Sequence, residues 1–408
     1  MKINKEAQKA IKIGSLCSIA YLAVYIARNI LSAVTPQMIE AGYTEEYIGR
    51  ISSLYFVFYA VGQLINGAIG DRIKAKWMIG CGLLGAGVAN FVFARVTMYP
   101  TGVMLAYAIT GFCLSMIYGP MTKTVAENTE PLYATRCSLG YTFASFFGSP
   151  SAGLLATFLV WQSVFTVSSA VLATMALLVF IFFTMFERNG TICYGQFKAE
   201  KKGKQALQVL FQRQIVKFAC IAVLTGIIRT SVVFWLPTYL AQRLGFTSQE
   251  STSIFTIATF IISFTSFISI FIYERLGRDM HKTVLIMFAS SSVFFLLTYI
   301  VQLPILNIIF IVIAIMSACG ASTMLYSRYC PSLRDTGRVS SVTGFLDFTS
   351  YMSAAIGNTV FASLVSFLGW SNLVLIWCVL MVIGVIIALP HRCQKAKAPA
   401  ETNTDNEV

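Results

Sequence analysis

The most constraining feature of this sequence is a succession of apolar segments, each about long enough to cross a membrane. A transmembrane helix needs roughly 20 apolar residues, and only helices or closed barrels satisfy their backbone groups inside lipid. The segments lack the alternating apolar and polar pattern of barrel strands. The sequence therefore predicts an all-α membrane protein with twelve transmembrane helices. These helices are expected at about residues 12–36, 47–70, 77–95, 100–122, 134–158, 161–186, 214–240, 250–273, 282–301, 304–327, 338–367 and 370–390.

Composition and the placement of charge both support a multi-pass membrane protein. Of the 408 residues, 57% are hydrophobic and only 12% are charged, whereas a soluble domain has roughly 25% charged residues. Of the 30 lysines and arginines, 25 fall at the termini or in alternate loops, and only Arg50, Arg95 and Arg243 lie near the opposite loops. This asymmetry predicts that both termini are cytoplasmic. We therefore assign the net charge of +13 to membrane topology and not to nucleic-acid binding. The short loops favour a bacterial inner membrane.

Other classes of site are disfavoured by the residue types present. The ten cysteines are scattered singly, and the two histidines show no metal-ligand spacing. The sequence contains no nucleotide-binding loop and no visible nucleophile–base pair. We expect no metal, no cofactor and no enzymatic activity.

The two halves of the chain repeat each other in the same order. Several residues recur in the second half at offsets of 200 to 203 positions, which indicates an internal duplication with parallel halves. The matched pairs are Arg28 with Arg229, Pro36 with Pro237, Gly42 with Gly245, Asp71-Arg72 with Glu274-Arg275, Pro131 with Pro331, and Arg136 with Arg338.

This duplication divides the chain into four parts. We expect an N-terminal six-helix half at 1–186, a basic cytoplasmic linker at 187–213 and a C-terminal six-helix half at 214–390, followed by a cytoplasmic tail at 391–408. The linker lysines are suited to contact anionic membrane lipid. The polar tail has the composition of a disordered segment. We expect a monomer whose two halves are pseudo-symmetric.

Arg28 lies near the middle of the first apolar segment. A cation at that depth costs roughly 2.5–3.5 kcal/mol on insertion scales, so it marks a functional site by default. Tyr21, Tyr25, Arg28 and Ser32 follow one another at spacings of 4, 3 and 4 residues, so they share one helical face. The alternative is that Arg28 snorkels to an interface or pairs with a backbone carbonyl.

The duplication places Arg229 at the equivalent position in the second half. A two-fold axis normal to the membrane would bring both arginines towards the axis near the midplane. Two guanidinium groups repel each other unless an anion lies between them, and each can bind phosphate or carboxylate in a bidentate manner. The pair therefore predicts an anion site, and two unrelated structural arginines are the alternative.

Neutral polar groups follow one face of the second predicted helix. Tyr55, Tyr59, Gln63 and Asn66 are spaced by 4, 4 and 3 residues and are suited to bind hydroxyls or a head group. Tyrosines also occur at ordinary helix contacts, so structural roles remain open for this face. Tyr141 and Ser145 repeat the pattern weakly in the fifth helix.

Asp347 is the one acid placed deep within an apolar segment, and Tyr351 and Asn358 share its face. A buried carboxylate is protonated when isolated and ionised beside an arginine. Three interpretations stay open. Asp347 could carry a proton, hold an arginine while no substrate is bound, or cap a helix near the cytoplasmic mouth.

Two loops carry an acid followed by a base at the expected cytoplasmic ends of helices. Asp71-Arg72 follows the second helix, and Glu274-Arg275 follows the eighth. These side chains can pair with neighbouring helix ends, so they predict a gate that breaks in the other transport state. A positive-inside anchor is the alternative.

These residues together resemble the organophosphate:phosphate antiporter family of the major facilitator superfamily. The resemblance covers nearly the whole chain. The residues that carry it are Tyr21, Tyr25, Arg28, Asn29, Pro36, Arg229, Trp235-Leu-Pro237-Thr238-Tyr239-Leu240, Gly344-Phe345, Tyr351 and Gly369-Trp370. It implies the major facilitator fold, with Arg28 and Arg229 binding a substrate phosphate. It also implies that Tyr21, Tyr25, Tyr59 and Tyr351 line the cavity.

The chain departs from the bacterial members of that family at four positions. Gln63 stands where those members have a lysine, Ser145 replaces a histidine, and Phe234 replaces an acid. Asp347 occupies a position that is usually small. The site is therefore less cationic, which favours a monoanionic or zwitterionic substrate.

We expect a secondary transporter that exchanges a small organic anion, an organophosphate or sugar phosphate, for phosphate by alternating access. One alternative is a proton-coupled solute symporter that uses Asp347. The other is a transporter-like membrane sensor that signals through the basic linker.

Overall fold

The computed structural model describes residues 5–70, 73–130, 147–194, 214–330 and 339–389, together with residues 133, 137, 140, 141 and 144. Every regular element among these residues is helical. In the N-terminal part these are α1 (Lys5–Glu40), α2 (Glu45–Gly70), α3 (Ala75–Arg95), α4 (Pro100–Ser115), α5 (Tyr118–Asn128), α7 (Gly148–Phe158) and α8 (Trp161–Arg188). In the C-terminal part they are α10 (Ile215–Gly226), η1 (Ile227–Val232), α11 (Val233–Leu244), α12 (Ser248–Ser263), α13 (Thr265–Arg275), α14 (Met280–Ile300), α15 (Pro304–Met324), η2 (Leu325–Tyr329) and α17 (Val339–Ala388).

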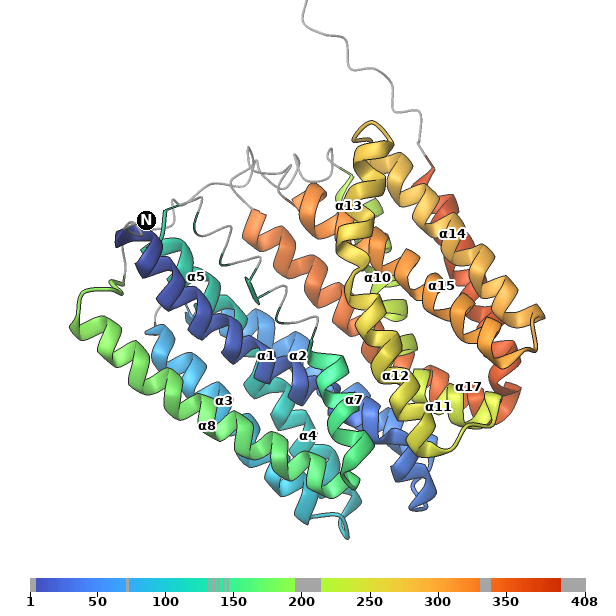
Figure 1. The fold of residues 1–408 in the computed structure, drawn as a ribbon, viewed down its shortest axis with the longest axis horizontal. Helices are drawn as coiled ribbons and strands as arrows, with labels where there is room; N and C mark the ends of the chain where they lie inside the picture. Colours follow the sequence, from blue (N-terminus) through green and yellow to red (C-terminus); the bar gives the residue numbers. More distant parts are fainter. Residues whose placement is uncertain are drawn as a thin grey trace, which may run out of the picture.

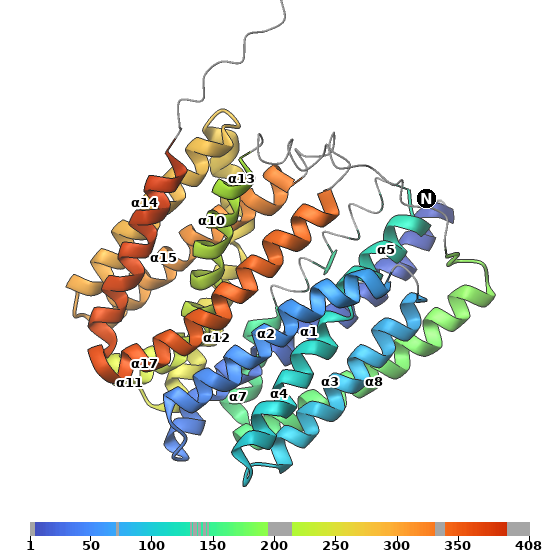
Figure 2. The ribbon, with the colours of Figure 1, turned by 180° about the vertical axis from the view of Figure 1, so that it is seen from behind.

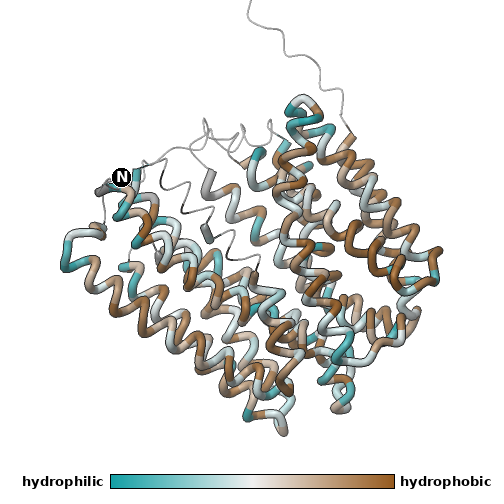
Figure 3. The backbone as a smooth tube through the Cα atoms, viewed as in Figure 1, coloured by the Kyte–Doolittle hydropathy of each residue, from teal (hydrophilic) through white to brown (hydrophobic). Residues whose placement is uncertain are grey.

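Ten helical segments of the described residues are long and apolar enough to cross a membrane. Figure 3 shows apolar residues along the helices and the most hydrophilic stretches near their ends. The segment Val342–Ala388 bends at Gly369, whose φ of 75° favours glycine, so it covers the eleventh and twelfth predicted segments. The fifth predicted segment is described continuously only from residue 147, and its last part is α7.

Several of the spanning segments are not regular helices. The chain turns between α4 and α5, and again at Phe264 between α12 and α13. Two spans contain π-helical turns, η1 after α10 and η2 after α15. Such turns are rare and occur frequently at functional sites. The sequence predicted these spans as uninterrupted, because apolar length does not report local hydrogen-bond register.

The helices form two bundles. Figures 1 and 2 show α1 to α8 on one side of the molecule and α10 to α17 on the other. Within the first bundle α3 packs on α8 and α2 on α4, and within the second α14 packs on α15 and α17. Between the bundles α2 packs along α17, α7 along α12, and α1 on α11.

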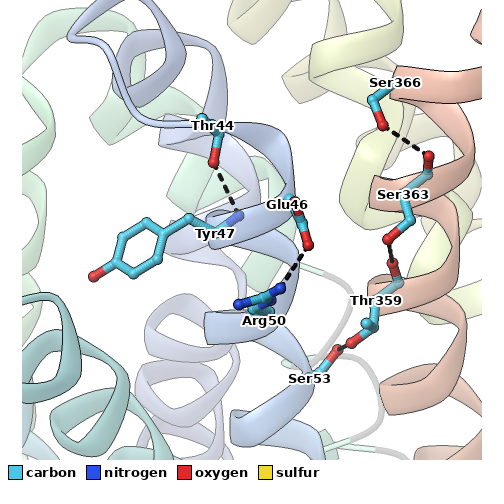
Figure 4. Close-up of polar contacts among 8 residues, drawn as sticks. All are labelled: Thr44, Glu46, Tyr47, Arg50, Ser53, Thr359, Ser363 and Ser366. Atoms are coloured by element: carbon cyan, nitrogen blue, oxygen red, sulfur yellow. Dashed lines mark hydrogen bonds and ion pairs between the residues drawn. The ribbon is translucent and has the colours of Figure 1, made fainter.

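Small residues allow α2 and α17 to approach closely. A Cβ atom added at Gly49 would lie 2.7 Å from the Cβ of Ala362. The Ser53 hydroxyl donates a hydrogen bond to the Ala355 carbonyl at 2.6 Å, and the Thr359 hydroxyl lies 2.6 Å from Ser53. Figure 4 shows Ser53 of α2 directed towards Thr359 on the neighbouring helix. This helix pair therefore holds the two bundles together.

The helix pair α7 and α12 makes the corresponding contact. Gly153 of α7 lies so close to α12 that an added Cβ would overlap the Thr256 hydroxyl. Thr256 follows Ser53 by 203 residues, and Ala355 follows Gly153 by 202. The close approach of Ser53 to Ala355 therefore recurs between Thr256 and Gly153, although the Thr256 hydroxyl donates its hydrogen bond to Thr252 of its own helix.

Some of the residues and segments named in the sequence analysis lie outside the described residues. These include Asp71, Arg72, Ser145 and the tail at 391–408. The predicted linker is described to residue 194. There Glu187 pairs with Lys76 at 2.6 Å and accepts a hydrogen bond from the Tyr194 hydroxyl at 2.9 Å. The boundaries of the four predicted parts stay predictions.

Candidate anion site between the two bundles

Arg28 extends from α1 across to the second bundle. Its Nη1 donates a hydrogen bond to the Tyr351 hydroxyl of α17 at 2.9 Å, and its guanidinium carbon lies 4.6 Å from the centre of that ring. The rings of Tyr25, Phe56 and Tyr59 lie 5.3, 5.5 and 5.5 Å from the same carbon. Aromatic faces attract a cation within about 6 Å of the ring centre. Four aromatic rings therefore hold Arg28 in place.

Arg229 approaches the same tyrosine from the π-helical turn η1. Its guanidinium carbon lies 5.8 Å from the ring centres of both Tyr326 and Tyr351. Its Nη2 atom is buried and has no hydrogen-bond partner among the described residues. A buried nitrogen of a cation without a partner is costly, so this atom is available to donate a hydrogen bond to a ligand or to water.

Tyr351 thus lies against both arginines, which come from different bundles. Arg28 lies within electrostatic range of Arg229. Among the described residues, no carboxylate lies within the 4.0 Å of an ion pair with Arg28 or Arg229. The structure therefore brings the two predicted cations together around one aromatic ring, with no carboxylate of a described residue in contact with either.

Tyr21 belongs to a second layer of the site. Its ring lies 5.0 Å from that of Tyr25, 5.5 Å from Tyr118 and 6.3 Å from Tyr141. Tyr25 is the member of this cluster that faces Arg28. The aromatic cluster therefore supports the arginine, and Tyr21 acts through Tyr25.

The polar face predicted for the second helix is divided among different environments. The ring centre of Tyr59 lies 5.5 Å from the guanidinium carbon of Arg28 and 5.0 Å from the ring centre of Tyr351. Tyr55 is buried against Tyr107 at 4.8 Å between ring centres. Asn66 donates a hydrogen bond to the Ser115 hydroxyl at 2.8 Å, so it joins two helices of one bundle. Gln63 is half-buried one turn beyond Tyr59.

Ser32 and Asn358 serve the contact between the bundles. The Ser32 hydroxyl donates to the Phe234 carbonyl of α11 at 2.7 Å. The Asn358 side chain donates to the Ser52 hydroxyl of α2 at 2.7 Å. Both side chains share a face with site residues, but neighbouring helices cover that part of the face.

Asp347 lies one turn before Tyr351 on α17, within electrostatic range of Arg229 and beside Tyr326. It does not reach ion-pair distance from either arginine, although all three side chains are among the described residues. The Tyr326 hydroxyl is buried and has no hydrogen-bond partner there either. The structure therefore shows no direct contact that would make Asp347 the counter-ion of either arginine. The role of Asp347 stays a prediction.

The predicted gate residues are described only in the second half. Glu274 and Arg275 end α13 at an exposed position, and Arg275 lies over the ring of Phe271 at 5.2 Å. Neither makes an ion pair within the part of the chain that the structure describes. Their gating role stays a prediction, and Asp71 and Arg72 lie outside the described residues.

Three site residues were not predicted from the sequence. Tyr326 and Phe56 each contact one arginine, and Tyr118 supports Tyr21. Phe56 follows Tyr55 directly, so helical spacing sets it off the polar face of that helix. Tyr326 could have been noticed as a tyrosine within a long run of small and aliphatic residues.

Comparisons with known proteins agree on one family. A family model described as Major Facilitator Superfamily matches residues 17–357. The chain is 22% identical to a glycerol-3-phosphate transporter of Bacillus subtilis over 57% of this chain and 58% of that protein. It therefore spans little more than half the length of this relative. It is 18% identical to the mouse glucose-6-phosphate exchanger SLC37A2 over 80% of this chain and 75% of that one.

Two further comparisons extend this picture. The membrane sensor protein UhpC of Salmonella typhimurium is 30% identical over 19% of this chain and 18% of its own length. Among solved structures, a bacterial homologue of the human lysosomal transporter Spinster, in an inward-facing and unoccupied conformation, has a TM-score of 0.75. It is 12% identical, and the match covers 93% of this chain and 96% of that one.

The predicted fold and the resemblance stated from the sequence are confirmed by these matches. The relatives are named as a transporter, an exchanger and a membrane sensor, and none of these names is that of an enzyme, as expected. The chain belongs to the Major Facilitator Superfamily and is a multi-pass membrane protein.

Proposed function

We propose that this protein exchanges a small organic phosphate for inorganic phosphate across a cell membrane, with Arg28 and Arg229 as the anion clamp. One observation carries the proposal. Both arginines lie against Tyr351, and a buried nitrogen of Arg229 has no hydrogen-bond partner among the described residues. A phosphate between the guanidinium groups would remove their repulsion and supply acceptors for the free nitrogen.

The names of the relatives support the same substrate class. A glycerol-3-phosphate transporter and sugar phosphate exchangers are among them. Both classes of substrate carry a phosphate group. We therefore assign the phosphate to the arginines and the rest of the molecule to the surrounding tyrosines.

Alternating access would follow from the way the bundles meet. The contacts of α2 with α17 and of α1 with α11 lie beyond the arginines, towards the end of α1 that is opposite the N-terminus. With both termini in the cytoplasm, as the charge asymmetry predicts, these contacts close the outer side. One bundle would rock against the other about the anion. Only the loaded carrier would cross readily, because the empty arginine pair repels itself, and this gives obligate exchange.

The test uses purified protein in liposomes loaded with labelled inorganic phosphate. Efflux is followed against external glycerol phosphate, sugar phosphates, phosphonates and carboxylates. We expect efflux that requires an external organic phosphate and fails in Arg28→Lys and Arg229→Lys. The control is Arg243→Lys, which changes a half-buried arginine that donates a hydrogen bond to Gln302 far from the site. Unimpaired exchange by both site variants would exclude the clamp.

A second candidate is a proton-coupled symporter. The observation that favours it is the Asp347 carboxylate within a spanning segment and without an ion-pair partner among the described residues. It requires uptake driven by a pH gradient without an exchange substrate, and loss of that drive in Asp347→Asn. A sensor, as one relative is named, would bind the ligand and move none of it.

A further inference from the structure

Asp347 and Tyr326 form a polar cluster that the anion clamp leaves unused. They come from different spans of the second bundle, α17 and η2, and lie side by side. The buried Tyr326 hydroxyl lies close enough to the Asp347 carboxylate to interact with it, but it makes no hydrogen bond of ordinary geometry with a described residue. Tyr118 of the first bundle lies within electrostatic range of Asp347 across the site. A carboxylate and two hydroxyl groups are acceptors, so the cluster is suited to a donor or a cation.

The charge balance of the site points to the same chemistry. Arg28 and Arg229 contribute two positive charges, and Asp347 contributes one negative charge when ionised. A phosphate monoester carries about −1.5 to −2 charges near neutral pH. The doubly charged ester alone would leave the site with a net negative charge next to the Asp347 carboxylate. A ligand that adds one ammonium group to that ester would leave the site neutral.

We propose that Asp347 and Tyr326 form a second subsite that receives an ammonium group, so that the preferred substrates are phosphorylated amines. This inference rests on the proposed function, because the phosphate must bind at the arginines. The carboxylate accepts two hydrogen bonds from the ammonium group, and the Tyr326 oxygen accepts the third. The carboxylate of Asp347, which forms no ion pair with a described residue, then has a cationic partner in the loaded state.

The position of the subsite limits the length of the substrate. Asp347 precedes Tyr351 by four residues on α17, which corresponds to a rise of roughly 6 Å along a helix. Tyr351 touches both arginines. A phosphate at the arginines and an ammonium at Asp347 are therefore separated by a short spacer of about two or three carbons, as in 2-aminoethyl phosphate.

The experiment compares two ligands that differ only in the amine. Binding of 2-aminoethyl phosphate and of ethyl phosphate is measured on the purified full-length protein by calorimetry, and exchange of each is followed in liposomes. We expect the native protein to prefer the amine by about 10- to 100-fold, the range for a hydrogen bond to a charged group. Asp347→Asn should abolish the preference and leave the affinity for ethyl phosphate unchanged or higher.

Further variants separate binding from structure. Asp347→Glu keeps the charge and should retain part of the preference. Tyr326→Phe should reduce it without abolishing it. Asp279→Asn makes the same substitution at an exposed helix cap and should change neither affinity.

The outcomes distinguish the subsite from the proposed function. If the native protein binds 2-aminoethyl phosphate and ethyl phosphate with equal affinity, the ammonium subsite is wrong. The arginine clamp is not affected by that result. An equal loss of both ligands in Asp347→Asn would also overturn the subsite, since the residue would then serve folding or coupling. If the native protein binds neither ligand and exchanges no phosphate, both the proposed function and the subsite are wrong.

Discussion

Arg28 and Tyr351 are 323 positions apart in the sequence and are joined by a 2.9 Å hydrogen bond between the two bundles. The same tyrosine ring faces Arg229. A single residue of α17 therefore contacts both members of the arginine pair. Any movement of one bundle against the other must change this contact, so the proposed alternating access would move the two cations relative to each other.

Removing the Tyr351 hydroxyl should weaken substrate binding without unfolding the protein. Tyr351→Phe keeps the ring beside both arginines but leaves Arg28 without its hydrogen bond. A hydrogen bond to a charged group contributes roughly 1.5–3 kcal/mol, so we expect about 10- to 100-fold weaker binding of an organic phosphate. Calorimetry on purified protein measures this. The control is Tyr239→Phe, which loses a 2.6 Å hydrogen bond to Asn307 away from the site and should lower only thermal stability.

Replacing either arginine by lysine should impair exchange more than it impairs folding. Lysine keeps the charge but cannot present two parallel donors to a phosphate. We expect at least a tenfold loss of exchange and a weaker discrimination between phosphates and carboxylates in Arg229→Lys. Competition assays in liposomes measure both. Equal selectivity of the native protein and this variant would contradict bidentate binding.

Adding one methyl group at Gly153 should destabilise the contact between α7 and α12. The new Cβ would overlap the Thr256 hydroxyl, so Gly153→Ala should separate the bundles at that end and slow exchange several-fold. Distances between spin labels on α7 and α12 would report the separation. The second substitution Thr256→Ala removes the overlapping oxygen and should restore most of the activity.

A matched control for this prediction is available on α17. No atom of the described residues lies within 4 Å of a Cβ added at Gly344, so Gly344→Ala should have little effect on exchange or on the label distances. If Gly153→Ala also has no effect, the helix contact does not limit the transport cycle.

The cap of α14 should contribute to stability in a pH-dependent way. The backbone N–H of Lys282 donates to the Asp279 carboxylate at 3.1 Å, which lowers the pKa of that carboxyl. A lowered pKa means that the stabilisation is complete above the usual aspartate pKa of roughly 3.9, and is lost as the pH falls through the folded value. Asp279→Ala should cost about 1 kcal/mol near neutral pH.

Thermal unfolding in detergent between pH 3 and pH 7 tests this cap. The difference between the native protein and Asp279→Ala should shrink at the acid end of that range. Asp279→Asn retains a capping side chain that does not titrate, so its difference from Asp279→Ala should stay constant with pH. A constant difference for the native protein as well would show that the ionised carboxylate adds nothing to the cap.

Much of the candidate site followed from the sequence because charge inside an apolar segment is rare. Arg28 and Arg229 could be paired from the sequence alone, since the duplication places them at equivalent positions. The structure brings them to the same tyrosine ring, and Tyr25 and Tyr59 complete the surroundings of Arg28. Tyr25 was predicted from its helical spacing relative to Arg28, and Tyr59 from its spacing along the polar face of the second helix.

Other residues on the same helical faces have different roles. Asn66 binds Ser115 inside one bundle, and Asn358 binds Ser52 between the bundles. Helical spacing predicts the direction of a side chain from its own axis, but not which neighbour covers it. Tyr326 was not found by this reasoning, because it approaches Arg229 from a π-helical turn, where the ordinary spacing of residues does not hold.

The sequence by itself determined the spanning segments, the two-fold repeat and the intramembrane cations, because hydrophobic length and buried charge are properties of a segment in lipid. Only the tertiary structure decided which polar side chains surround the cations and which ones join the helices. That choice depends on close approach at positions such as Gly49 and Gly153, where the lack of a side chain lets two helices meet. The packing of distant segments, and not the pattern within any one of them, places Tyr351 between the arginines.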